Sequence, residues 1–91
     1  GLAGGTAPAV FNGADEACVA AFVAGELPFA RIVDTVARVV EEHLDGRGDV
    51  AGSVWVDGNN VALSDVITAD AWARRRAADI VQEQTKEGTR A

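Results

Sequence analysis

The sequence predicts an all-α fold, a small antiparallel bundle of about four helices with one long irregular loop. Apolar residues recur at spacings of three and four along most of the 91 residues, as they do on one face of a helix. Gly and Pro mark the breaks between these apolar stripes. An apolar fraction of 48% indicates a packed core in a chain that is long enough for a single domain.

The first helix is predicted over residues 12–24, because Asn12 is a preferred N-cap. A start near Pro8 also fits the sequence, since Pro is tolerated in a first helical turn. Gly25 lies where a left-handed residue would end the helix. The predicted apolar face consists of Phe11, Ala14, Cys18, Ala21 and Phe22.

The second helix is predicted over residues 29–44, with Pro28 at its first position. So short a connection between two helices normally makes them antiparallel. The apolar stripe of this helix is stronger than that of the first, and it consists of Phe29, Ile32, Val33, Val36, Val39, Val40 and the pair His43 and Leu44.

Residues 45–60 lose this periodicity and are rich in Gly and Asn. A small hairpin around Asp57 and Gly58 is one interpretation. An isolated two-stranded hairpin is only marginally stable, so an irregular loop that tucks in Trp55 is the favoured one.

The remaining sequence predicts two further helices, over residues 64–69 and 71–86. Ser64 is a good N-cap for the shorter one, and Asp70 can cap the longer one. The predicted buried face of the last helix consists of Trp72, Ala73, Ala77, Ile80, Val81 and Gln84.

The adjacent carboxylates Asp15 and Glu16 are the first candidates for a metal site or a proton-transfer pair. Neighbouring helical residues point about 100° apart, so the two carboxylates do not readily share one ion. Behind an Asn12 cap they would lie in the first turn, where the helix dipole favours negative charge. The favoured interpretation is that they start a helix.

Other reactive residue types also have simpler structural roles. Ser64 as a nucleophile would need a base, and the chain contains only one His, so a cap is the favoured role. His43 is expected near the surface at the negative end of its helix, and Cys18 is expected to pack as a small hydrophobe. Arg74 to Arg76 diverge around a helical turn, and the pair Gly4 and Gly5 is too short for a phosphate loop. No residue is predicted to be catalytic, cofactor-binding or metal-ligating.

Net charge and cysteine content limit the kinds of partner and the cellular location that are expected. A net charge of −6 and a pI near 4.5 argue against nucleic acid or an anionic membrane as partner. No apolar run approaches the roughly 20 residues that span a bilayer. The single Cys18 cannot form an internal disulfide, which makes a reducing cytoplasm the expected location. Because the chain begins at Gly1 without Met, a processed or excised piece is expected.

Two blocks of sequence carry a family resemblance. "GGTAPAVFNGADEACVAAFVAGELPFARIV" and, downstream, "LSDVITADAWARRRA" resemble the C-terminal part of 1-deoxy-D-xylulose 5-phosphate reductoisomerase. That family usually has Asn-Ala-Ala-Asn-Glu before an Ala/Val-rich helix. The matching residues here are Asn12, Gly13, Ala14, Asp15 and Glu16, then Ala20, Ala21, Phe22 and Phe29, and finally 70–74. Gly13 in place of Ala and the Gly-rich insertion at residues 45–60 depart from the family pattern.

The resemblance implies that residues 1–91 are a C-terminal helical domain that packs against the other domains of a parent enzyme. The family converts 1-deoxy-D-xylulose 5-phosphate to 2-C-methyl-D-erythritol 4-phosphate on the non-mevalonate isoprenoid route, with NADPH and a divalent metal, Mg²⁺ or Mn²⁺. Its cofactor and metal ligands belong to the preceding domains, so the resemblance transfers no ligand to this chain. The chain alone is expected to be inactive.

Two other classes of protein remain open from the residues. Acyl-carrier-like domains are also small, acidic and helical. The sequence around their carrier serine resembles Asp-Ser-Leu, whereas this chain has Leu63, Ser64 and Asp65, in the opposite order. A free-standing acidic helical interaction domain is the second class. For an excised domain we further expect an exposed apolar surface and weak homodimerisation, with contributions from Leu2, Val10, Val54, Trp55 and Val56.

Overall fold

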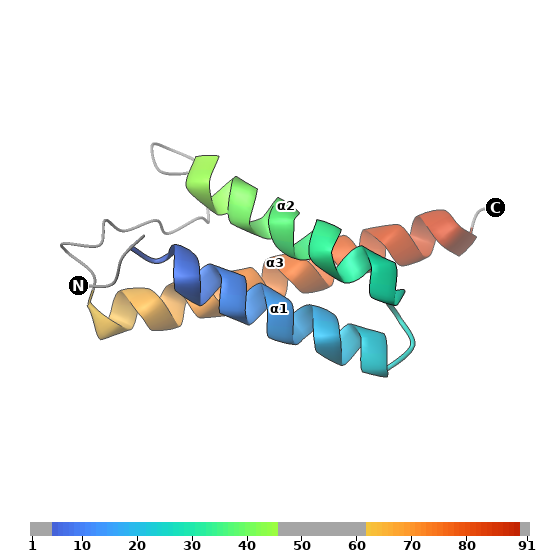
Figure 1. Ribbon diagram of the computed structural model, residues 1–91, viewed down its shortest axis with the longest axis horizontal. Coiled ribbons are helices and arrows are strands. Elements are labelled where there is room, and N and C mark those ends of the chain that lie inside the picture. The colour runs from blue at the N-terminus through green and yellow to red at the C-terminus, as the bar shows by residue number, and fades with distance from the viewer. Residues whose placement is uncertain (1–4, 46–61, 90–91) are drawn as a thin grey trace.

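The computed structural model describes residues 5–45 and 62–89, and within the last helix it describes side chains as far as residue 85. The elements follow the chain as helix α1 (Ala7–Val23), a 3₁₀ turn (Phe29–Arg31), helix α2 (Ile32–Asp45) and helix α3 (Leu63–Thr89). The helices run up, down and up, so α2 is antiparallel to both α1 and α3 (Figure 1). The prediction of an all-α fold is confirmed for the described residues.

Helix α1 begins at Ala7, five residues before the predicted start at residue 12. Pro8 lies in its first turn, where the missing N–H removes one of the donors that would otherwise lack a partner. The helix therefore passes through Asn12 without a break, and the predicted cap at Asn12 is wrong. Of the two starts that fit the sequence, the one near Pro8 is confirmed.

The end of α1 matches its prediction. Gly25 has a φ of +79°, a left-handed conformation that favours glycine. The Gly25 N–H donates to the carbonyl oxygen of Phe22 at 3.0 Å, and the Glu26 N–H donates to that of Ala21 at 2.8 Å. These two bonds form a Schellman motif, which turns the chain toward α2. Pro28 is extended and precedes the 3₁₀ turn that leads into α2.

Helix α3 is one continuous helix of 27 residues, where two helices over residues 64–69 and 71–86 were predicted. Asp70 does not cap a second helix, because its carboxylate accepts a hydrogen bond from Arg74 Nε at 2.9 Å within the same helix. Ser64 is likewise not the N-cap, since the helix already begins at Leu63. Asp65 supports this start instead, by accepting the Ala62 N–H at 2.9 Å, as the third residue of a capping box does.

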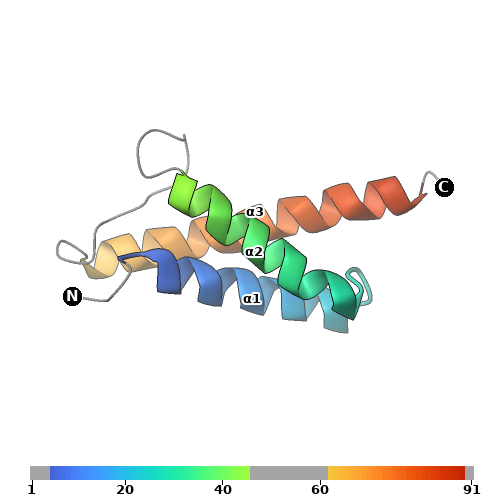
Figure 2. The ribbon, with the colours of Figure 1, turned by 45° about the horizontal axis from the view of Figure 1, so that its top comes forward.

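The core lies between the three helices and is built from small and branched aliphatic side chains. In Figure 2, α3 passes behind both shorter helices and extends past α2 toward the C-terminus. The positions predicted as buried on α3 are buried or half-buried, and on the other helices the prediction is confirmed for Ala14, Cys18, Ile32, Val36, Val39 and His43. It is wrong for Phe11, Phe22, Phe29, Val33 and Leu44, which are exposed. The buried apolar residues are Val10, Ala14, Cys18, Leu27, Ile32, Val36, Val39, Ala69, Ala73, Ala77, Ile80 and Val81.

Gly13 of α1 lies directly against the backbone of α3. A Cβ placed on it would stand 2.7 Å from Asp70 Oδ1 and 2.9 Å from the Asp70 carbonyl oxygen. Gly13 lies inside the helix, where Gly costs up to about 1 kcal/mol relative to Ala. The close approach of the two helices explains why a residue without a side chain is accommodated here.

Candidate functional site

The acidic pair Asp15 and Glu16 lies in the middle of α1, and no acidic residue occupies the first turn of that helix. The interpretation that the pair starts a helix is therefore wrong. Glu16 instead forms an ion pair with Arg74 of α3. Asp15 lines a groove between α1 and α2. The two carboxylates face different neighbours, as expected for adjacent helical residues.

The three consecutive arginines of α3 diverge, as the sequence predicted. Arg74 pairs with Asp70 in its own helix and with Glu16 of α1. Arg76 points to α2, where it binds Glu42. Arg75 is exposed. Because these guanidinium groups face separate partners, they do not converge on a common anion.

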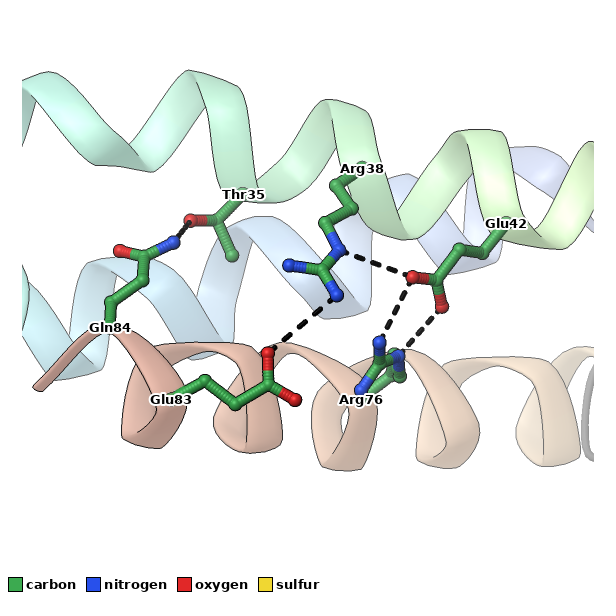
Figure 3. A network of polar contacts seen from close by, with 6 residues as sticks. All are labelled: Thr35, Arg38, Glu42, Arg76, Glu83 and Gln84. Carbon is green, nitrogen blue, oxygen red and sulfur yellow. Dashed lines mark hydrogen bonds and ion pairs between the residues drawn. The ribbon is translucent and has the colours of Figure 1, made fainter. Parts of the chain in front are cut away.

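A row of polar contacts joins α2 to α3 (Figure 3). Arg76 donates to both carboxylate oxygens of Glu42, with Nε and Nη2 at 2.6 and 3.0 Å. Arg38 donates to the same carboxylate at 3.3 Å and also lies 3.6 Å from Glu83. Farther along, Gln84 donates to the hydroxyl of Thr35 at 3.3 Å. We call the six residues that the figure labels the polar seam: Thr35, Arg38, Glu42, Arg76, Glu83 and Gln84.

The polar seam shifts the ionisation of its central carboxylate. The hydrogen bonds from Arg76 favour the charged form, and they hold the pKa of Glu42 below its ordinary value of 4.5 despite partial burial. Such a bidentate pair is geometrically specific, so it helps to fix the register between α2 and α3. The seam is structural, because each of its charges has a partner of opposite sign.

His43 is fully buried, which contradicts its expected position near the surface. Its Nε2 atom lies 2.7 Å from Oγ1 of Thr6, a residue that is also fully buried. The Trp72 ring of α3 packs against the imidazole, with 5.7 Å between ring centroids. Burial lowers the pKa of His43 below its ordinary value of 6.5, so the neutral ring is favoured. The sequence did contain a signal for this burial, because His43 lies on the apolar stripe of α2.

Cys18 and Ser64 are the two other reactive residue types that the sequence analysis considered, and they lie in opposite environments. Cys18 is buried in the core, as predicted, and burial raises the pKa of its thiol above the ordinary value of 9.0. A thiol in this state is a poor nucleophile. Ser64 is exposed in the first turn of α3.

An exposed apolar surface follows the α1 and α2 side of the molecule, and we call it the apolar face. Its large members are Phe11, Phe22, Phe29 and Val33, of which Val33 is 75% exposed. Phe22 and Phe29 make an edge-to-face contact with 5.6 Å between ring centroids. Between α1 and α2 this face contains a groove of about 470 Å³, lined by Phe11, Asp15, Ile32, Val33, Val36, Ala37, Val40 and Glu41.

Of the residues predicted to form an exposed apolar surface, Val10 alone lies within the described part of the chain. It is fully buried in the core because α1 begins before it and presents it to the other helices. Leu2, Val54, Trp55 and Val56 lie outside the described residues, as does the choice between a hairpin and a loop at residues 45–60. Within the described residues, the apolar face is formed by Phe and Val side chains that sequence analysis assigned to the core.

The described residues contain neither a group of metal-ligating side chains nor a helix that could span a membrane. Within residues 5–45 and 62–85, whose side chains are described, no three His, Cys, Asp or Glu side chains are grouped so as to hold a metal ion. No helix in this part of the chain is both long enough and apolar enough to cross a membrane.

Comparison with known proteins agrees with the sequence resemblance. A family model described as DXP reductoisomerase C-terminal domain matches residues 1–76. A 1-deoxy-D-xylulose 5-phosphate reductoisomerase of Cutibacterium acnes is 52% identical over 81 residues, which are 88% of this chain and 20% of that protein. A protein of the same name from Streptomyces avermitilis is 48% identical over 88 residues, covering 96% of this chain and 20% of the relative.

Similarity extends to a relative of lower sequence identity. The reductoisomerase of Moorella thermoacetica is 39% identical over 83 residues, or 90% of this chain and 18% of that protein. The chain thus spans about a fifth of the length of the curated relatives it matches. No solved structure matches it. These matches favour the reductoisomerase resemblance over an acyl-carrier-like or free-standing interaction domain, and the chain belongs to the family of DXP reductoisomerase C-terminal domains.

Proposed function

We propose that residues 1–91 act as a structural, non-catalytic domain of their parent reductoisomerase and dock on its remaining domains through the apolar face. The parent would convert 1-deoxy-D-xylulose 5-phosphate to 2-C-methyl-D-erythritol 4-phosphate in non-mevalonate isoprenoid biosynthesis. The relatives are named 1-deoxy-D-xylulose 5-phosphate reductoisomerases, and this name supports the substrate of the proposed reaction.

The observation that carries the proposal is the contrast between the polar and apolar surfaces. Arg74 and Arg76, with their carboxylate partners, hold one helix to another. Such mutual pairing serves the fold, and it leaves these charges committed to partners within the domain. The large exposed side chains at the α1 and α2 side are instead apolar.

The apolar face has the character of an interface between domains. Interfaces of this kind within one chain bury about 600–1,500 Å², and exposed apolar patches beyond a few hundred Å² usually have a partner. Asp15 and Glu41 at the edge of the groove add an acidic rim to it. We therefore infer that the docking surface on the parent is apolar at its centre and basic at that edge.

The cofactors are assigned to other parts of the parent. No group of described side chains fits a divalent metal, so we propose that Mg²⁺ or Mn²⁺, together with NADPH, binds in the preceding domains. There the metal would supply electrophilic activation and NADPH would supply the hydride. We place the parent in the cytoplasm, where a free buried thiol such as Cys18 is stable.

The proposal is tested by substituting residues of the apolar face in the full-length parent. Phe11→Ser and Val33→Ser together should detach the domain, because they remove apolar area from the centre of the interface. Amide hydrogen exchange of α1 and α2 should then rise, and kcat should fall through lost domain organisation. Ile67→Ser is the matched control, since Ile67 is also exposed, at 60%, but lies at the start of α3.

Two outcomes would contradict the docking role. One is exchange in α1 and α2 that is identical in the parent and in the Phe11→Ser, Val33→Ser variant. The other is equal loss of protection with the Ile67→Ser control, which would mean that any exposed apolar side chain matters alike.

A further inference from the structure

The groove between α1 and α2 carries one carboxylate on each wall, Asp15 on α1 and Glu41 on α2. Each has an acidic neighbour in sequence, Glu16 and Glu42 respectively. Both neighbours are committed inside the domain, because they form ion pairs with arginines of α3. Figure 3 shows Glu42 turned toward α3 in this way. Each acidic pair therefore has one member that joins the helices and one that faces the groove.

The two groove carboxylates have no cation of their own within the described residues. Asp15 and Glu41 form neither an ion pair nor a side-chain hydrogen bond there. Asp15 is already half-buried in the domain alone. A charge that is removed from water is costly unless it is paired. A purely apolar cover over this groove would leave two unpaired carboxylates behind, so the occupant of the groove must bring positive charge.

The other residues of the groove determine the rest of the occupant's chemistry. They are all apolar, among them Ile32, Val36 and Val40, and the groove of about 470 Å³ has room for a long side chain. Arginine and lysine lay an apolar stem on such a surface while the charged head stays with polar groups. Arginine fits better, because its planar guanidinium has five N–H donors and can bind two carboxylates at once.

We propose that one arginine from the remaining domains of the parent lies along this groove, with its stem on the apolar floor and its guanidinium bound by Asp15 and Glu41. The inference rests on the proposed function and deepens it, because it names the side chain that the docking surface contributes. The chain covers 20% of the Cutibacterium acnes relative, so most of a parent of that length lies outside it and can supply the arginine.

The test compares neighbouring carboxylates in the full-length parent. Asp15→Asn and Glu41→Gln keep the shape of the side chain but remove the charge that holds the arginine. Each should raise amide exchange in α1 and α2 about tenfold, since a charge-assisted hydrogen bond is weakened, and leave exchange in α3 unchanged. Glu16→Gln and Glu42→Gln are the matched controls, because they remove the same charge one residue away. They should raise exchange in both helices that each ion pair joins, α3 included.

A double variant tests whether one cation serves both carboxylates. With a shared guanidinium, Asp15→Asn combined with Glu41→Gln should raise exchange by less than the product of the two single effects. An effect equal to the product would give each carboxylate a partner of its own and would overturn the shared arginine.

Carbodiimide treatment of the parent tests the identity of the cation. This reagent joins carboxylates to lysine amines but not to guanidinium groups, so no cross-link from Asp15 or Glu41 to the remaining domains is expected. A cross-link from either residue to a lysine outside residues 1–91, located by mass spectrometry, would overturn the assignment to arginine.

The outcomes separate this inference from the proposed function. If exchange responds to the Phe11→Ser, Val33→Ser variant but not to Asp15→Asn or Glu41→Gln, docking through the apolar face is retained and the arginine is overturned. If exchange responds to neither, both are overturned. An equal rise in all three helices for Asp15→Asn and for Glu16→Gln would assign the effect to the stability of the domain, and would also overturn the arginine.

Discussion

Arg76 of α3 holds Glu42 of α2 through two nearly parallel hydrogen bonds of 2.6 and 3.0 Å, at the centre of the polar seam in Figure 3. The pair connects two helices that are also joined by the other polar contacts of the seam, from Arg38 to Glu83 and from Gln84 to Thr35. It thereby complements the apolar core, which lies between the three helices.

Replacing Arg76 by Lys tests the geometry of this pair. Lys keeps the charge but cannot make two parallel bonds, so Arg76→Lys should lower the free energy of unfolding by about 1 kcal/mol, a modest loss because the pair is partly exposed. The lowered pKa of Glu42 means that its contribution is present above pH 4.5 and is lost as pH falls through the folded-state pKa. Denaturant titration at pH 7 and pH 3 measures both effects. A loss that is the same at the two pH values would argue against the pair.

Gly13→Ala should destabilise the domain even though Ala is the better helix former. The gain in helix propensity is about 1 kcal/mol, but the new Cβ would meet Asp70 at 2.7 and 2.9 Å and force α1 from α3 at a cost of about 1–3 kcal/mol. Asn12→Ala is the control, because Asn12 is the exposed preceding residue of the same helix. Thermal melting should show a lower Tm for Gly13→Ala and an unchanged or higher Tm for Asn12→Ala. A raised Tm for both would mean that the helices separate at no cost.

His43 should make the domain less stable in mild acid. Its folded-state pKa lies below the ordinary value of 6.5, so the unfolded chain binds more protons as pH falls through that value. The free energy of unfolding should therefore decrease from pH 7.5 to pH 5.5. His43→Gln has no titrating ring and should lose this slope, which urea denaturation at the two pH values would reveal. An equal slope in the variant would assign the effect to other groups.

The isolated chain should neither bind NADPH nor turn over substrate. This follows from the assignment of the cofactor groups to the preceding domains. Isothermal titration calorimetry of the fragment with NADPH should give no binding heat at micromolar concentrations. A micromolar dissociation constant for the fragment alone would overturn that assignment.

The isolated chain should also self-associate weakly through the apolar face. Its apolar area favours contact, but ordering costs and the repulsion between two chains of charge −6 oppose it. Sedimentation at increasing concentration should detect a dimer that moderate salt strengthens by screening. Val33→Ser should weaken the dimer, whereas Leu63→Ser, also exposed but on α3, should not. A strict monomer at millimolar concentration would mean that the face is too small to pair with itself.

Local sequence determined much of this protein. The spacing of Ile32, Val36 and Val39 predicted α2 and its buried side, and Gly25 predicted the left-handed end of α1. These predictions succeed because helix periodicity and a positive φ depend on residues that are close in sequence. The two sequence blocks likewise determined the family, which the comparisons support.

Tertiary structure decided what local rules left ambiguous. Asn12 and Asp70 are good caps, yet both lie inside helices, because packing between α1 and α3 stabilises helix on either side of them. Glu16 is committed to Arg74, and His43 to Thr6, by contacts that span 58 and 37 residues of sequence. Periodicity places a residue on a face of its own helix, but only the arrangement of the helices determines what that face meets. For this reason the sequence established the class of fold, while the partners of its charged and polar side chains emerged only from the packed structure.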